Sequence, residues 1–147
     1  MYEIFVFFHS IFRWLVLISL LYIIGSSIHG LISKRNYTRA DSLTRALTTI
    51  ISHTQLLIGF TLYFVLSPIT GFFIKNGSEG NHEIWFFGIY HIALMFSSIV
   101  VMTIGGSITK RATTNYVRFK TISIYFSIAL LLILAAIPWF RPFLRNF

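Results

Sequence analysis

The chain has no cysteine among its 147 residues, and only four acidic residues and three prolines. Without cysteine it cannot form disulfides, iron–sulfur clusters, thiolate zinc sites or a covalent haem attachment. Charged residues make up 11% of the chain, against roughly 25% in soluble domains, whereas 56% of it is hydrophobic and its mean hydropathy is +0.78. This composition indicates an integral membrane protein, in which histidine is the main side chain left to bind a metal.

Four apolar runs are long enough to cross a bilayer, which takes roughly 20 residues at about 1.5 Å of rise each. They predict transmembrane helices at residues 4–33, 43–66, 83–109 and 117–139. Pro68 and Pro138 are expected to close the second and fourth helices, and Asp41-Ser42-Leu43 to cap the start of the second. The short connections favour a single all-α domain, an up-down four-helix bundle.

Net charge is +8, and the basic residues lie between the apolar runs rather than in one nucleic-acid-binding stretch. Two connections carry most of them: Lys34, Arg35, Arg39 and Arg45 in the first, and Lys110, Arg111, Arg118 and Lys120 in the third. By the positive-inside rule both connections face the cytoplasm, and both termini lie outside. Arg141 and Arg145 oppose this orientation weakly. With Glu3 near the start and no cleavage site after the first run, we expect no removable signal.

Histidine depth is the most informative calculation. In the predicted orientation His9 lies about 8 Å below the outer end of the first run, and His91 about 10 Å below the outer end of the third. The first and third helices of a bundle can face each other across the core, so these two imidazoles are expected to meet. His53 lies roughly 20 Å from the outer end of the second run and is the rival partner for His91.

Two level histidines on facing helices suit the axial positions of one b-type haem. Gly88, one turn before His91, is small enough to leave room for the macrocycle. Met95, one turn after His91 on the same face, could contact the haem or serve as its sixth ligand. Arg13, one turn after His9, could neutralise a propionate. The alternatives are ordinary packing for Met95, and for Arg13 snorkelling to the interface or pairing with Glu3 or Glu83. The histidines themselves could be interhelical hydrogen-bonding groups.

His53 and Gln55 point to roughly opposite sides of the second helix. Either could contact a quinone headgroup or form an interhelical hydrogen bond. A second haem between His29 and His53 is geometrically possible but less favoured, because His29 lies close to the membrane interface.

Several segments resemble a family of small bacterial four-helix membrane proteins, labelled cytochrome b or cytochrome b-like. They are His9-Ser10-x-x-Arg13-Trp14, Ser52-His53-x-Gln55-Leu56-Leu57-Ile58-Gly59, His91-x-x-x-Met95, Thr103-Ile104-Gly105 and Ala136-Ile137-Pro138-Trp139. The order of these residues also resembles, more loosely, one half of the haem A synthase fold. The resemblance implies haem ligation by His9 and His91, and a multi-pass protein of the bacterial cytoplasmic membrane.

We therefore expect a membrane b-type cytochrome that binds one haem b through His9 and His91. It would transfer electrons as a small subunit, with other membrane redox proteins as partners in a respiratory or quinone-linked complex. The alternatives are a membrane subunit or assembly factor without cofactor, and a small transporter using His53. The transporter requires a polar path that the third and fourth helices do not provide.

Overall fold

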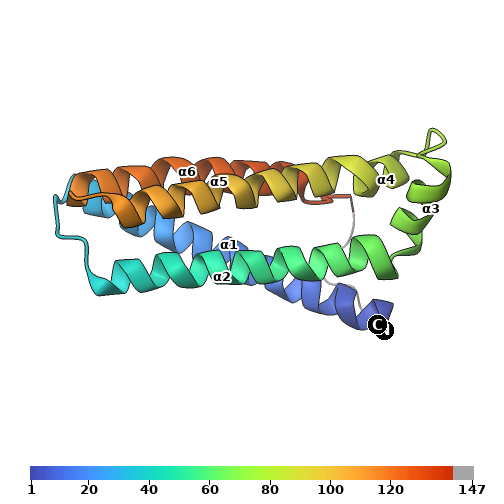
Figure 1. Ribbon diagram of the computed structural model, residues 1–147, viewed down its shortest axis with the longest axis horizontal. Helices are drawn as coiled ribbons and strands as arrows, with labels where there is room; N and C mark the ends of the chain where they lie inside the picture. Colours follow the sequence, from blue (N-terminus) through green and yellow to red (C-terminus); the bar gives the residue numbers. More distant parts are fainter. Residues whose placement is uncertain (141–147) are drawn as a thin grey trace.

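The computed structural model describes residues 1–140, which leaves Arg141 and Arg145 outside the described residues. The described part is helical throughout, without strands, and its helices are joined by short connections (Figure 1). In chain order the helices are α1 (Tyr2–Ile32), α2 (Arg39–Thr61), the π-helical segment η1 (Leu62–Leu66), α3 (Pro68–Asn76), α4 (His82–Trp85), the π-helical segment η2 (Phe86–Tyr90), α5 (His91–Arg111) and α6 (Asn115–Ala136).

Four helical stretches within residues 1–140 are long and apolar enough to cross a membrane: Tyr2–Ile32, Arg39–Leu66, His82–Arg111 and Asn115–Ala136. The second consists of α2 continued by η1, and the third of α4, η2 and α5 in sequence. The prediction of an all-helical chain with four such helices is confirmed.

The helices pack in a ring. α1 contacts α2 and α6, and α5 contacts the same two helices, so α1 and α5 occupy opposite corners. This diagonal placement is what brings the first and third predicted helices face to face. The two basic connections lie together at one end of the bundle, whereas α3, α4 and the N-terminus lie at the other (Figure 1).

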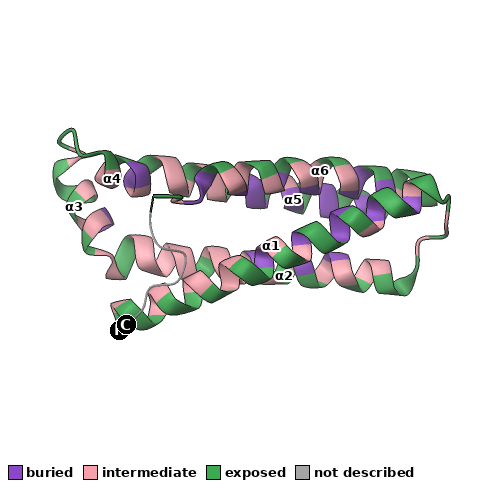
Figure 2. Ribbon diagram, turned by 180° about the vertical axis from the view of Figure 1, so that it is seen from behind, coloured by how far each residue is buried: buried purple, intermediate pink, exposed green. Residues whose placement is uncertain are grey.

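The apolar core is formed mainly by α1, α5 and α6 (Figure 2). Leu20, Met102 and Phe126, one from each helix, are completely buried and belong to one cluster. In contrast, the buried side chains of α2 are all polar: Arg45, Thr48 and Ser52. The apolar contact of α2 with the core comes instead from the partly buried Ile51 and Leu56.

Helix α2 begins earlier than the sequence predicted. Thr38 is its N-cap, and Thr38 and Asp41 form a capping box in which each side chain accepts from the other's backbone N–H. The predicted Asp41-Ser42-Leu43 cap is therefore wrong. Asp41 does contribute to the cap, but from the third helical position, where a carboxylate can reach back to the N-cap amide.

The connection at residues 67–82 is also more ordered than expected. Pro68 does not merely end the second helix; it occupies the first turn of α3, whose N-cap Ser67 accepts a hydrogen bond from the Thr70 amide. Proline suits this position because its missing N–H would have no intrahelical partner there. Pro138 follows the end of α6 at Ala136, as predicted.

We predict that Gly105→Ala destabilises the bundle by about 1–3 kcal/mol through overpacking. A Cβ at Gly105 would collide with Cβ and Cγ of Tyr125, which are close to the α6 backbone and cannot swing away. The matched control is Gly25→Ala on α1, where a Cβ would meet nothing within 4 Å. Denaturant titration of both variants in detergent, followed by circular dichroism, measures the difference; equal stability of the two would contradict the α5–α6 packing.

Candidate functional site

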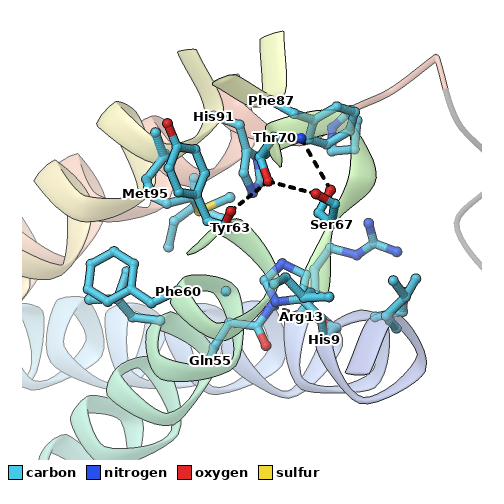
Figure 3. Close-up of a pocket in the computed structure, with 18 of the residues that line it drawn as sticks. His9, Arg13, Gln55, Phe60, Tyr63, Ser67, Thr70, Phe87, His91 and Met95 are labelled. Carbon is cyan, nitrogen blue, oxygen red and sulfur yellow. Dashed lines mark hydrogen bonds between the residues drawn. The ribbon is translucent and has the colours of Figure 1, made fainter. Parts of the chain in front are cut away.

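A cavity of about 180 Å³, partly open to the outside, lies between the α1–α2 pair and the α5–α6 pair (Figure 3). Its lining includes side chains from α1, α2, η1, α3, η2, α5 and α6, and it is at the end of the bundle remote from the basic connections. The lining is mostly apolar, with a few polar side chains directed inward, as is usual for sites that bind small molecules.

His9 of α1 and His91 of α5 face each other in this cavity. Their ring centroids are 6.3 Å apart, and the ring planes are inclined by 64°. An imidazole nitrogen binds a metal at about 2 Å and lies about 1 Å from its ring centre, so two rings on opposite sides of one metal ion have centres about 6 Å apart. The separation of His9 and His91 therefore matches that of two imidazoles on one ion.

His91 has its orientation set by the end of α6. Its Nδ1 lies 2.7 Å from the carbonyl oxygen of Ala136, one of the last carbonyls of α6, which no longer have partners within the helix. A carbonyl can only accept, so Nδ1 carries the proton and donates. Nε2 is then the unprotonated nitrogen, and the hydrogen bond fixes the tautomer that a metal needs.

His9 is held from α2. The Gln55 side chain donates from Nε2 to the His9 carbonyl oxygen at 2.8 Å, and the His9 ring lies against Gly59, where a Cβ would be 3.3 Å from His9 Cε1. Two buried polar atoms here, His9 Nδ1 and Gln55 Oε1, have no hydrogen-bond partner among residues 1–140. Because an unpaired buried polar atom costs free energy, these atoms indicate a site completed by a further group.

Two π-helical segments flank the cavity. Tyr63 of η1 donates from its hydroxyl to the Gly88 carbonyl of η2 at 2.8 Å. The Thr70 hydroxyl of α3 donates to the Tyr63 carbonyl at 2.6 Å (Figure 3). A π-helical turn displaces backbone carbonyls from the regular ladder, and such turns are frequent at functional sites. Here the freed carbonyls join the second and third membrane-length helices and α3 at the level of the histidines.

Five of the predicted site residues line the cavity: His9, Arg13, Gln55, His91 and Met95. Arg13 lies one turn beyond His9, with its guanidinium 5.9 Å from the Trp14 ring centre. The structure brings these five together from α1, α2 and α5.

The remaining two predicted residues lie elsewhere. Gly88 does not line the cavity; the Phe73 ring of α3 packs where its Cβ would be. The prediction assumed an α-helix up to His91, but η2 has more residues per turn, which rotates Gly88 away from the His91 face. His53 makes the interhelical contact that was the alternative to a ligand role: its Nε2 lies 3.3 Å from Thr103 Oγ1 of α5. Its Nδ1 lies 2.8 Å from the Thr49 carbonyl oxygen within α2.

The donor set suits a haem better than a bare metal ion. Within residues 1–140 no three His, Asp or Glu side chains gather, and haem iron needs only two axial ligands because the porphyrin supplies four nitrogens. The cavity is smaller than the roughly 300–1,000 Å³ of pockets that enclose whole ligands. This cavity would therefore not enclose a whole haem with the side chains placed as they are.

Sequence reasoning missed the contribution of α3 and of the π-helical segments. Ser67, Ile69 and Thr70 line the cavity, as do Tyr63 and Phe87. Ser67-Pro68 is a recognisable helix start, with a capping serine before a first-turn proline, so α3 had a signal. The π-helical segments had none, since a single extra residue in a turn leaves no mark on an apolar sequence.

The fold and the cavity define an all-helical chain with four helices able to span a membrane and a paired-histidine pocket near one end. No family model matches this chain, and neither the curated proteins nor the solved structures include a match to it. The resemblance to cytochrome b-like proteins therefore rests on its motifs and stays a prediction.

We predict that Tyr63→Phe lowers the free energy of unfolding by about 0.5–1.5 kcal/mol, because it removes the hydrogen bond that links η1 to η2. Tyr22→Phe, at a position 65% exposed, is the control and should change little. Thermal unfolding of both variants in the same detergent gives the comparison. A Tyr63 variant as stable as the control would show that this link does not support the cavity wall.

Proposed function

We propose that this chain is an integral membrane b-type cytochrome that binds one haem b between His9 and His91. The observation that carries the proposal is the facing of two imidazoles, 6.3 Å apart, with the tautomer of one set by the Ala136 carbonyl. Each histidine comes from a different membrane-length helix, so the pair also fits a group bound between helices.

The predicted ligands and their neighbours have distinct tasks in this proposal. His91 presents Nε2 as a ligand, while its ring is held by the hydrogen bond to α6. His9 presents its ring beside Gly59, whose missing side chain leaves space for that ring. Arg13 supplies positive charge one turn from His9, where a propionate would be neutralised. Met95 contributes an adaptable apolar wall. The bound haem would carry single electrons.

The orientation follows from charge. Both basic connections lie at one end of the bundle and the histidine pocket at the other (Figure 1). By the positive-inside rule the basic end is cytoplasmic, which puts the N-terminus and the pocket toward the outer face of a bacterial cytoplasmic membrane. A haem near one face leaves most of the bilayer to be crossed by other means. We therefore propose that the chain works as a small subunit beside further redox proteins or a quinone.

The decisive experiment is a spectrum. Protein purified from haem-supplied cells should show a Soret band and, on reduction, the sharp α-band of six-coordinate haem b. His91→Ala should lose the bound haem, and His9→Ala should lose it or leave a five-coordinate spectrum. His53→Ala is the matched control: it removes a histidine that does not line the cavity, so its haem content should equal that of the wild type. A wild-type protein without haem would refute the proposal.

A second test concerns Arg13. A positive charge near haem favours the reduced, less positive state, so Arg13→Gln should lower the midpoint potential, by on the order of tens of millivolts. Lys34→Gln, at the opposite end of the bundle, should leave it unchanged. Redox titration followed at the α-band measures both. Equal potentials in the two variants would show that Arg13 does not interact with the haem.

A scaffold without cofactor is the second candidate, and one observation favours it. Polar side chains of the membrane-length helices already bond to neighbouring helices, such as Gln55 to the His9 carbonyl and His53 to Thr103. In membranes such bonds alone stabilise helix association, by about 0.6 kcal/mol on average. If the scaffold is correct, His91→Ala lowers stability but changes no visible spectrum.

A further inference from the structure

A second cavity lies at the other end of the bundle, where the two basic connections meet. Its volume is about 360 Å³. The segment before α2, the first turns of α2, the end of α5 and the start of α6 contribute its lining: Tyr37, Thr38, Arg39, Ser42, Arg45, Thr109, Lys110 and Arg118. It shares no residue with the histidine cavity.

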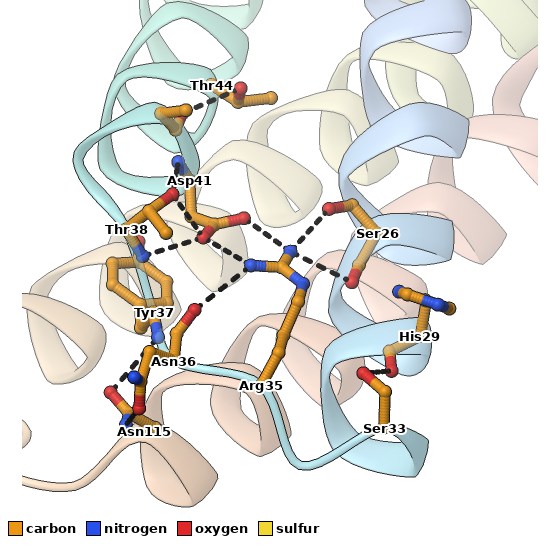
Figure 4. A network of polar contacts seen from close by, with 11 residues as sticks. Ser26, His29, Ser33, Arg35, Asn36, Tyr37, Thr38, Asp41, Thr44 and Asn115 are labelled. Atoms are coloured by element: carbon orange, nitrogen blue, oxygen red, sulfur yellow. Dashed lines mark hydrogen bonds and ion pairs between the residues drawn. The ribbon is translucent and has the colours of Figure 1, made fainter.

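The charge of this lining has one sign. Four of the eight residues are Arg or Lys, and none is acidic. The nearest acid on the α2 side, Asp41, is fully engaged: Arg35 binds both of its carboxylate oxygens at 2.7 Å, and Thr38 also donates to it (Figure 4). Among the described residues, no acidic side chain in the cavity therefore pairs with these four cations.

Arg45 is the residue that makes this cavity more than a basic surface. It is only 6% exposed, and its Nε has no hydrogen-bond partner among residues 1–140. Its guanidinium packs beside Gly106 of α5, where a Cβ would be 3.6 Å from one terminal nitrogen. A buried charge is costly unless it is paired, so a guanidinium held in this position indicates an anion that binds to it.

A buried hydroxyl and a positioned arginine complete the arrangement. The Tyr37 hydroxyl is buried. Burial raises the pKa of Tyr37 above its ordinary value, and the neighbouring Arg45 side chain offsets part of that rise, so the hydroxyl lies beside Arg45 and stays protonated. Arg118 already donates from Nε to the Ala112 carbonyl at 3.0 Å, which fixes its side chain at the edge of the cavity. The site thus combines a fixed buried guanidinium, further cations and a hydroxyl donor.

We propose that this cavity binds a phosphate group, with Arg45 as the central ligand. A guanidinium matches phosphate geometry through paired N–H donors, and several cations suit an anion carrying more than one negative oxygen. The phosphate could belong to an anionic lipid headgroup or to a soluble phosphate compound. Basic pockets between transmembrane helices on the cytoplasmic side are known lipid headgroup sites, and the location at the basic end of the bundle agrees with that source. The proposal does not depend on haem binding.

The test compares the thermal stability of the full chain in neutral detergent with added phosphatidylglycerol, phosphatidylcholine or inorganic phosphate. Arg45→Gln removes the buried guanidinium that would bind the anion. Arg39→Gln removes an exposed guanidinium of the same cavity, and because Arg39 is at the surface this variant should still fold. Arg111→Gln is the matched control, because Arg111 is exposed, carries the same charge and does not line the cavity. Loss of a charge-assisted hydrogen bond should lower the affinity for the anion about tenfold or more.

The expected result is stabilisation of the wild type and of Arg111→Gln, lost in Arg45→Gln and weakened in Arg39→Gln. Stabilisation by phosphatidylglycerol but not by inorganic phosphate assigns the site to a lipid; stabilisation by inorganic phosphate assigns it to a soluble compound. If neither stabilises the wild type more than phosphatidylcholine does, the proposal is wrong. The proposal is equally wrong if Arg111→Gln loses as much of the anion's stabilising effect as Arg39→Gln does, since that effect would then be general charge attraction.

Discussion

The hydrogen bond between His91 and the Ala136 carbonyl connects the fold to the site. It pairs a carbonyl at the end of α6, where the helical ladder has stopped, with an imidazole at the start of α5. In apolar surroundings neither group could stay unpaired without cost. The bond gives each group a partner and holds the C-terminal end of α6 against the N-terminal end of α5. It also leaves the other nitrogen of His91 available across the cavity from His9.

The molecule concentrates its polar groups at two levels. At one end the π-helical segments, α3 and Gln55 surround paired histidines; at the other, cations surround a buried arginine. Between them the core of α1, α5 and α6 is apolar and closely packed. Polar groups in a membrane-length helix are expensive, and they usually mark the place where such a helix functions. The polar side chains of the two cavities are therefore better explained by binding than by a contribution to the stability of the fold.

Much of the fold could be predicted. Run length gave the four long helices, and helical rise placed His9 and His91 at one level, because 1.5 Å per residue holds for any α-helix. The structure differed where local backbone geometry changed. The η2 segment turned Gly88 toward Phe73, Thr38 rather than Asp41 began α2, and α3 replaced an expected loop.

By itself the sequence determined the apolar helices, the two basic connections and the position of each histidine along its helix, because these depend only on composition and spacing. Which helices became neighbours was decided by the tertiary structure. Only the diagonal placement of α1 and α5 let His9 and His91 meet, and only the convergence of α2, α5 and α6 buried Arg45 among other cations. The physical reason is that a partner on another helix depends on how the helices rotate and pack, and spacing along one chain carries no record of that.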